Sequence, residues 1–187
     1  MTEKRVLRAD AQRNRTALVA AARAAFDCGE EPIRFDDFAA LAGLGVGTLY
    51  RHFPTREALA MAVYQGEVTA LCDRARELLA RQPAGEALAT FLREFVDYVV
   101  THVALARTLA VRVSGLSDDH AEAGYALERT VADLVAAARR EGSVRQDTDP
   151  GALMLILHGI GAAASRTHWA TEARQAVEIL LRGLKAT

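Results

Sequence analysis

The fold of this chain is decided by residues 35–53, which read FDDFAALAGLGVGTLYRHF. Two short helices that cross at a fixed angle need three things: a small residue where their backbones approach, a turn residue that tolerates positive φ, and an apolar residue that packs the second helix back. Ala39, Gly43 and Leu49 supply these properties in the required order. The stretch therefore predicts a helix-turn-helix, with the second helix starting near Val46.

The residues that follow strengthen this interpretation. The spacing of the alanine, the glycine and the leucine also arises by chance in helical proteins, but here an aromatic and basic cluster comes directly after it, from Tyr50 to Arg56. Residues 42–59, AGLGVGTLYRHFPTREAL, resemble the signature of TetR-type transcriptional regulators. The resemblance covers roughly residues 13–64, and beyond them only the number and length of the helices agree.

The resemblance implies an all-α protein with two domains. Residues 1–54 would form a three-helix, helix-turn-helix DNA-binding domain, and residues 55–187 a helical domain for effector binding and dimerisation. Apolar spacing, caps and breakers predict helices beginning near residues 10, 35, 46, 56, 85, 104, 118, 150 and 172. A length of 187 residues, 51% hydrophobic residues and four prolines fit a folded, helix-rich chain. The mid-helix Gly66 is expected at a close packing contact, with a bend as the alternative.

Charge is distributed unevenly along the chain. The formal net charge is −1, so attraction to DNA has to come from local charge. Residues 4–15 carry five basic side chains against Asp10 alone. Two interpretations of this segment remain open. It contacts the DNA backbone or the minor groove, or it is an ordinary disordered tail.

The second helix of the motif supplies candidate DNA contacts. Gly45 and Gly47 have no side chain that would obstruct the start of this helix, so its backbone amides can approach phosphate. Thr48 offers a hydroxyl to phosphate and a methyl group to thymine. Val46 and Arg51 are the candidates for contact with base edges, although Arg51 could equally be a solvated charge.

Further contacts follow from the resemblance. Tyr50 and His52 match family positions that meet the DNA backbone, and Arg56 matches a basic phosphate contact. Alternatively, Tyr50 packs between helices and His52 is an ordinary hydrogen-bonded polar residue. Arg34 replaces the Thr or Ser that commonly caps the first helix of the motif; its guanidinium cannot cap but can reach phosphate.

The last two predicted helices suggest a homodimer. The helix from residue 150 is apolar on almost every side, so it has to be buried on several faces. Together with the last helix it would expose an apolar patch that a symmetric four-helix contact could cover, unless both are internal core. The expected interface residues are Leu153, Leu157, Ile160, Gly161, Ala164, Ala173, Val177, Leu180 and Leu184.

The resemblance also implies a small-molecule effector in the core of the second domain, whose binding would release a repressor from its operator. The candidate pocket residues are Cys72, Phe91, Phe95, Tyr98, His102, Arg112, Tyr125, His158 and Trp169. For each of these residues, the alternative is that it packs in the core and does not contact an effector. Because the surrounding helices carry few fixed charges, a largely apolar effector is expected, and its identity is left open.

A small all-helical enzyme or metal protein is the alternative from another class, and it receives little support. The five histidines are never three or four residues apart, no Cys-x-x-Cys is present, and no glycine-rich loop follows a strand, so no metal, cofactor or catalytic site is expected. A DNA-binding protein without an effector remains an alternative. Two distant cysteines, no apolar leader and no apolar run of about 20 residues predict a cytoplasmic protein without a membrane partner.

Overall fold

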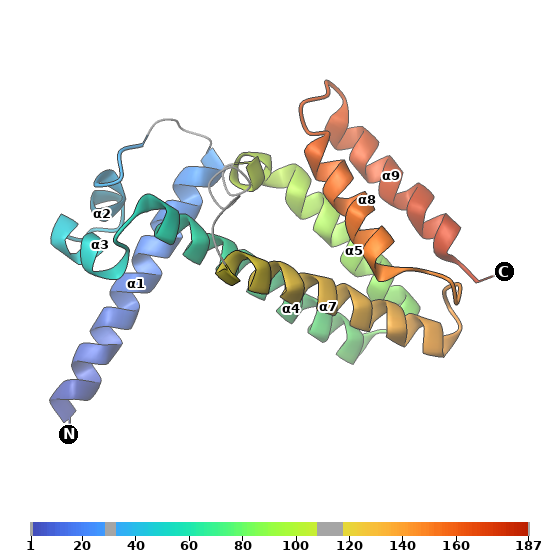
Figure 1. Cartoon of the computed structure of the whole chain (residues 1–187), viewed down its shortest axis with the longest axis horizontal. Coiled ribbons are helices and arrows are strands. Elements are labelled where there is room, and N and C mark those ends of the chain that lie inside the picture. Colours follow the sequence, from blue (N-terminus) through green and yellow to red (C-terminus); the bar gives the residue numbers. More distant parts are fainter. Residues whose placement is uncertain (1, 29–32, 108–117, 187) are drawn as a thin grey trace. The chain divides into compact units, whose positions relative to one another are not determined.

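The computed structural model describes residues 2–28, 33–107 and 118–186, and within these ranges it is all-α, as predicted. Figure 1 shows the helices in chain order. Their bounds are α1 (Thr2–Cys28), α2 (Asp37–Leu41), α3 (Val46–His52), α4 (Arg56–Arg81), α5 (Ala84–Thr101), α7 (Asp118–Glu141), α8 (Pro150–Ala162) and α9 (Trp169–Leu184). Residues 103–107 are also helical, and the rest of the helix predicted over 104–113 lies outside the described residues.

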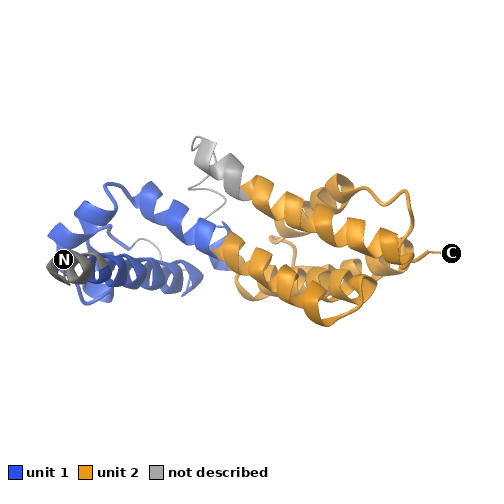
Figure 2. Ribbon diagram, turned by 90° about the horizontal axis from the view of Figure 1, so that it is seen from below, with its two compact units in different colours: residues 1–66, 104–116 blue, residues 67–103, 117–187 orange. Residues whose placement is uncertain are grey.

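The chain forms two compact units, which Figure 2 distinguishes by colour. The first unit contains residues 1–66 and 104–116, and the second contains residues 67–103 and 117–187. The division falls inside α4, after Gly66, whereas the sequence places the domain boundary just before this helix.

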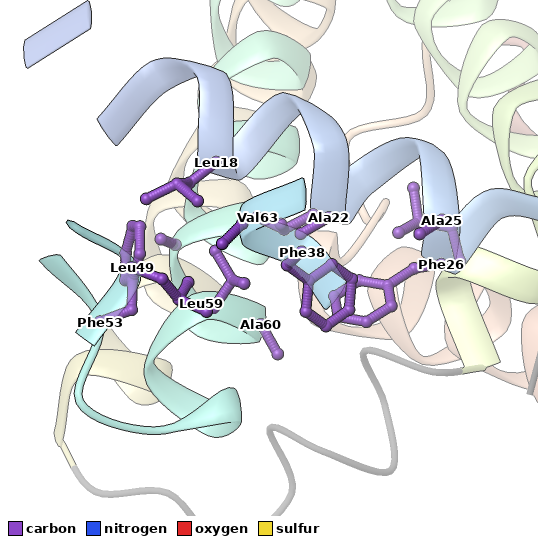
Figure 3. Packing of buried hydrophobic residues seen from close by; sticks show 13 residues of the cluster. Leu18, Ala22, Ala25, Phe26, Phe38, Leu49, Phe53, Leu59, Ala60 and Val63 are labelled. Atoms are coloured by element: carbon purple, nitrogen blue, oxygen red, sulfur yellow. The ribbon is translucent and has the colours of Figure 1, made fainter. Parts of the chain in front are cut away.

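The first unit is built around one aromatic and aliphatic core. From α1, the side chains of Leu18, Ala22 and Phe26 point to the same side because they recur at helical spacing. They meet Phe38 of α2, whose ring lies edge-on to the Phe26 ring with centroids 5.5 Å apart. Figure 3 shows these residues packed with Leu49 and with the first turns of α4. The core therefore fixes α2 and α3 against two longer helices.

The turn between α2 and α3 has the predicted geometry. Gly43 has a φ of +67°, in the left-handed region that disfavours other residues. The backbone N–H of Leu44 donates to the carbonyl of Ala39 at 2.8 Å, which closes the end of α2. Ala39 and Leu49 are fully buried on either side of the turn. The helix-turn-helix predicted from residues 35–53 is therefore present.

The second unit is arranged around α5, which contacts α7, α8 and α9. Its buried face carries Leu88, Phe91, Leu92 and Phe95. The carboxylate of Glu141, at the end of α7, accepts hydrogen bonds from the backbone N–H groups of Ala84 and Gly85 at 3.1 and 2.7 Å. The bond from Gly85 is the main cause that lowers the pKa of Glu141 below its usual value. This carboxylate therefore ties the start of α5 to the end of α7.

Three local predictions are wrong. The first helix begins at Thr2 instead of near residue 10, because the added segment contains good helix formers and no Gly or Pro. The last helix begins at Trp169, ahead of the predicted start near residue 172, and an ion pair between Arg166 and Glu172 at 2.8 Å spans this start. A Cβ added at Gly66 would meet nothing within 4 Å, so this glycine is not at a close packing contact.

Replacement by alanine is expected to have opposite effects on stability at Gly43 and at Gly66. Replacing Gly43 with Ala should lower the free energy of unfolding by about 1–2 kcal/mol, because the left-handed conformation strains an L-residue. Replacing Gly66 with Ala should raise it by about 0.5–1 kcal/mol, because Ala favours a helix and the added Cβ has room. Urea denaturation followed by circular dichroism measures both. Equal shifts of the same sign would contradict the turn geometry described above.

Candidate nucleic-acid interface

One face of α3 is exposed and the other is buried. Leu49 is fully buried, whereas Val46, Gly47, Tyr50 and Arg51 are exposed. The four exposed positions recur at the helical repeat and therefore share one side of the helix. Burial of Leu49 thus presents the residues that the sequence assigns to DNA contact.

Tyr50 is held in place by α2 and by the residues that precede it. Its hydroxyl donates a hydrogen bond to the carboxylate of Asp36 at 2.9 Å. Its ring stands perpendicular to the ring of Phe35, with centroids 5.3 Å apart, and the Phe35 ring packs in turn against Phe38. The hydrogen bond to Asp36 is the main cause that raises the pKa of the Tyr50 phenol above its usual value.

The other residues predicted on α3 occupy different environments. The Nε of Arg51 donates to the carbonyl oxygen of Gly47 at 3.1 Å, so the side chain turns back along the exposed face of the helix. Thr48 and His52 are half-buried, and the His52 ring is tilted against the ring of Phe53. Gly45 precedes the helix with an extended backbone and is exposed.

Basic side chains lie at the rim of the first unit's core. The guanidinium of Arg56 lies over the ring of Phe38 at 5.3 Å, and that of Arg15 lies over Phe53 at 5.1 Å. Arg34 is exposed, and its backbone N–H donates to the Asp37 carboxylate at 3.1 Å. As expected, Arg34 does not cap α2. The N-cap position belongs to Asp36, whose side chain makes no capping bond.

Some of the predicted effector residues lie inside the second unit. Cys72, Phe91 and Phe95 are buried, and Cys72 accepts a hydrogen bond from the Thr130 hydroxyl at 3.2 Å. Tyr98 and His102 are half-buried, and their ring centroids lie 4.8 Å apart.

Two of the other predicted pocket residues are exposed. Tyr125 is 59% exposed on α7, and His158 is exposed on α8, because the nearby Leu127 and Leu157 occupy the buried sides of these helices. Trp169 is buried, but its indole N–H donates to the carbonyl of Ile160 at 2.5 Å and so joins α9 to α8. Arg112 lies outside the described residues.

Two open surface hollows lie away from the predicted effector residues. One, of about 570 Å³, is lined by Leu88, Val144 and Leu184 among others. The other, of about 500 Å³, follows α9 past Arg174 and Ile179.

The predicted dimer residues face the interior of a single chain. Leu153, Leu157, Ala173, Val177 and Leu184 are buried, and Ile160, Gly161, Ala164 and Leu180 are half-buried. This happens because α8 and α9 turn these residues toward α5 and α7. The apolar residues left exposed are different ones and include Ala152, Leu155, Ile156 and Gly159 on α8, and Ile179 on α9.

The sequence did not reveal several residues of the candidate DNA-binding surface on α3 or of the exposed apolar surface on α8. Asp36 and Phe35, which hold Tyr50, gave no signal because they lie 14 and 15 residues from it. The outward face of α8, made of Ala152, Leu155, Ile156 and Gly159, gave no signal either, because this helix is apolar on almost every side.

Among the described residues, no three His, Cys, Asp or Glu side chains are grouped so that they could hold a metal ion. Of the helices in the described ranges, none combines the length and apolarity that crossing a membrane would require.

A helix-turn-helix with an exposed second helix, followed by a larger helical unit, defines the class of DNA-binding transcriptional regulators. The family described as "Transcriptional regulator SbtR-like, C-terminal domain" matches residues 83–186. The chain belongs to the TetR family of transcriptional regulators.

Solved and curated proteins agree with this assignment. The chain is 35% identical to the TetR regulator SCO0520 of Streptomyces coelicolor, covering 92% of this chain and 99% of that one, with a TM-score of 0.72. It is 34% identical to a TetR regulator of Mycobacterium vanbaalenii, covering 96% and 99%, with a TM-score of 0.73. It is also 27% identical over 99 residues to the HTH-type transcriptional regulator SAR0097 of Staphylococcus aureus, covering 50% of this chain and 52% of that protein. The match thus spans about half the length of this curated relative. The predicted family, fold and regulatory function are confirmed.

The contact between Tyr50 and Asp36 predicts a raised pKa of the Tyr50 phenol, which can be measured. A pH titration of the protein carrying ¹³C-labelled tyrosine should show the Tyr50 phenol ionising above the usual tyrosine pKa of about 10. Since the pKa is raised in the folded state, the stabilisation from this contact is present below pH ~10 and is lost as the pH rises through the folded value. The Asp36→Asn variant should titrate closer to the usual value. An unchanged Tyr50 pKa in that variant would contradict the contact.

Proposed function

We propose that this regulator is a homodimeric repressor that binds a pseudo-palindromic operator in the cytoplasm and is released by a small molecule. The exposed face of α3 above the buried Leu49 is the observation that supports operator binding most directly. A twofold dimer would place two such helices in successive major grooves, about 34 Å apart or somewhat more.

The chemistry of the exposed residues suggests separate roles. Arg51 and Val46 are proposed to contact base edges, since both are exposed on the same side of α3. Thr48, His52, Arg34 and Arg56 are proposed to contact phosphate. Phosphate contacts would set the position of the protein on DNA, while base contacts would select the sequence.

The dimer is proposed to use the outward faces of α8 and α9. Leu155 is 73% exposed and Ile179 is 63% exposed, which is unusual for large apolar side chains. Ala152 and Gly159 border Leu155 and Ile156 on α8, and their small size would allow two helices to approach closely. The interface thus keeps the predicted helices but uses neighbouring residues.

The effector is proposed to contact α4 and α5. Phe91 and Phe95 offer an apolar surface, with ring centroids 6.3 Å apart. The hydroxyl of Tyr98 donates to the carboxylate of Glu67 beside them, and His102 packs on the Tyr98 ring. This combination suits a largely apolar molecule with one polar group. Its binding would release DNA only if it favours a dimer state that fits the operator poorly.

Operator binding can be tested by fluorescence anisotropy on DNA taken from upstream of the gene, with random DNA as competitor. The Arg51→Ala variant should bind its preferred site at least about tenfold more weakly, because a base contact is lost. The Arg140→Ala variant is the matched control, since it removes one exposed positive charge from α7 in the second unit. It should bind within about twofold of the wild type.

If the upstream DNA is not preferred, the operator can be selected from a random library and the comparison repeated. Equal losses in the arginine variants, or no sequence preference in any selected pool, would contradict the proposed function.

The dimer can be tested by sedimentation equilibrium. The Leu155→Glu variant should dissociate at least about a hundredfold more readily, because burying an unpaired carboxylate costs about 3 kcal/mol or more. Tyr125→Glu, at another exposed apolar position in the second unit, should leave the dimer intact. A wild type that sediments as a monomer at micromolar concentration would contradict the proposed interface.

A further inference from the structure

The hydrogen bond between Tyr50 and Asp36 restricts what Tyr50 can recognise. A phenol has one hydrogen to donate and lone pairs that accept, whereas an ionised carboxylate only accepts. At an oxygen–oxygen distance of 2.9 Å, the hydrogen of Tyr50 is therefore directed to Asp36. The Tyr50 oxygen that remains exposed on α3 can act only as an acceptor.

This arrangement is a poor match for a phosphate. Phosphate oxygens also accept hydrogen bonds and cannot donate one to Tyr50. The negative charge of Asp36, one hydrogen bond away, would in addition repel the phosphate charge. A Tyr50–phosphate contact would require the hydroxyl to leave Asp36 first.

The major groove does offer donors that fit. The exocyclic amino groups at N4 of cytosine and N6 of adenine are the hydrogen-bond donors that base pairs present there. An acceptor formed by a phenol oxygen beside a carboxylate complements either of them, and Asp side chains are among those that accept from cytosine N4.

The surroundings keep the pair in this arrangement. The Tyr50 ring is perpendicular to Phe35, and the series of edge-on rings continues through Phe38 to Phe26 in the core. The carboxylate of Asp36 makes no capping bond to α2, although Asp36 occupies the N-cap position, so it is available to Tyr50. The phenol is protonated at neutral pH, since its usual pKa is about 10 and the hydrogen bond to Asp36 raises it.

We propose that Asp36 and Tyr50 form a base-reading pair that accepts a hydrogen bond from the amino group of a cytosine or an adenine in the operator. This inference rests on the proposed binding of DNA by α3. It assigns to Tyr50 a role in sequence selection instead of the backbone contact expected from the family position, and it adds Asp36 to the recognition surface.

The test is a double-mutant cycle between the full-length protein and DNA. Operator sites are selected from a random library with the wild type and with Tyr50→Phe, which keeps the ring packed on Phe35 and removes only the hydroxyl. One position in each half-site should prefer cytosine or adenine in the wild type and should lose about five- to tenfold of that preference in the variant.

At that position the DNA is then resynthesised with 2-pyrimidinone for cytosine or with unsubstituted purine for adenine, each of which lacks the amino group. Removal of the amino group should weaken wild-type binding about five- to tenfold and should leave Tyr50→Phe nearly unaffected. The analogue that produces the loss distinguishes cytosine from adenine. An equal loss in both proteins, or a Tyr50→Phe variant that binds all sequences more weakly by one factor, would overturn the inference.

Two further variants separate this role from general effects. Asp36→Asn should alter preference at the same position, whereas a uniform gain in affinity for all sequences would show only relief of charge repulsion and would overturn the pair. Arg56→Gln is the control for a phosphate contact: it should weaken all sequences alike and reduce the salt dependence by about one unit of slope. Absence of any sequence preference in the wild type would overturn the proposed function as well, whereas preference without coupling overturns this inference alone.

Discussion

Burial of Leu49 is the interaction on which the DNA-facing surface depends. A helix as short as α3, Val46–His52, is not stable by itself in water, because too few hydrogen bonds offset the cost of nucleation. Its orientation is therefore imposed by packing, with Leu49 fully buried in the core that α1, α2 and α4 share. The turn at Gly43 sets the angle, and the exposed side chains follow from the helical repeat. Recognition residues can then vary without any change in the core that positions them.

In the second unit, too, buried residues position the helices and leave the exposed residues free for other roles, although its helices are longer. The apolar face of α5 is buried by its neighbours, while ion pairs join the exposed sides of the helices. Arg74 of α4 and Glu94 of α5 form a two-pronged pair with both distances at 2.7 Å, and the hydrogen bond from Arg74 lowers the pKa of Glu94. Because such partly exposed pairs contribute little to stability, their main effect is to fix which helix faces lie together.

The sequence predicts well whatever depends on local chemistry or on periodicity. The left-handed turn at Gly43, the buried Leu49 and the start of α8 near residue 150 all follow from such signals, and Asp149 caps this start by accepting from Gly151 and Ala152 at 3.2 Å. The facing of α8 was not predictable in this way. A helix that is apolar almost all round has no amphipathic contrast, so Leu155 and Leu157 look equivalent until the neighbouring helices are placed.

Tyr50 shows the same limit at the scale of one side chain. Its motif predicts correctly where the residue lies, on the exposed face of α3. The direction of its hydrogen bond depends on Asp36, which lies on another element and has no periodic relation to it. Since a donor binds phosphate whereas an acceptor binds a base amino group, this partner changes the class of group that the same tyrosine can recognise. A family motif therefore defines the position of a contact, while the hydrogen-bond partners of that residue decide its chemistry.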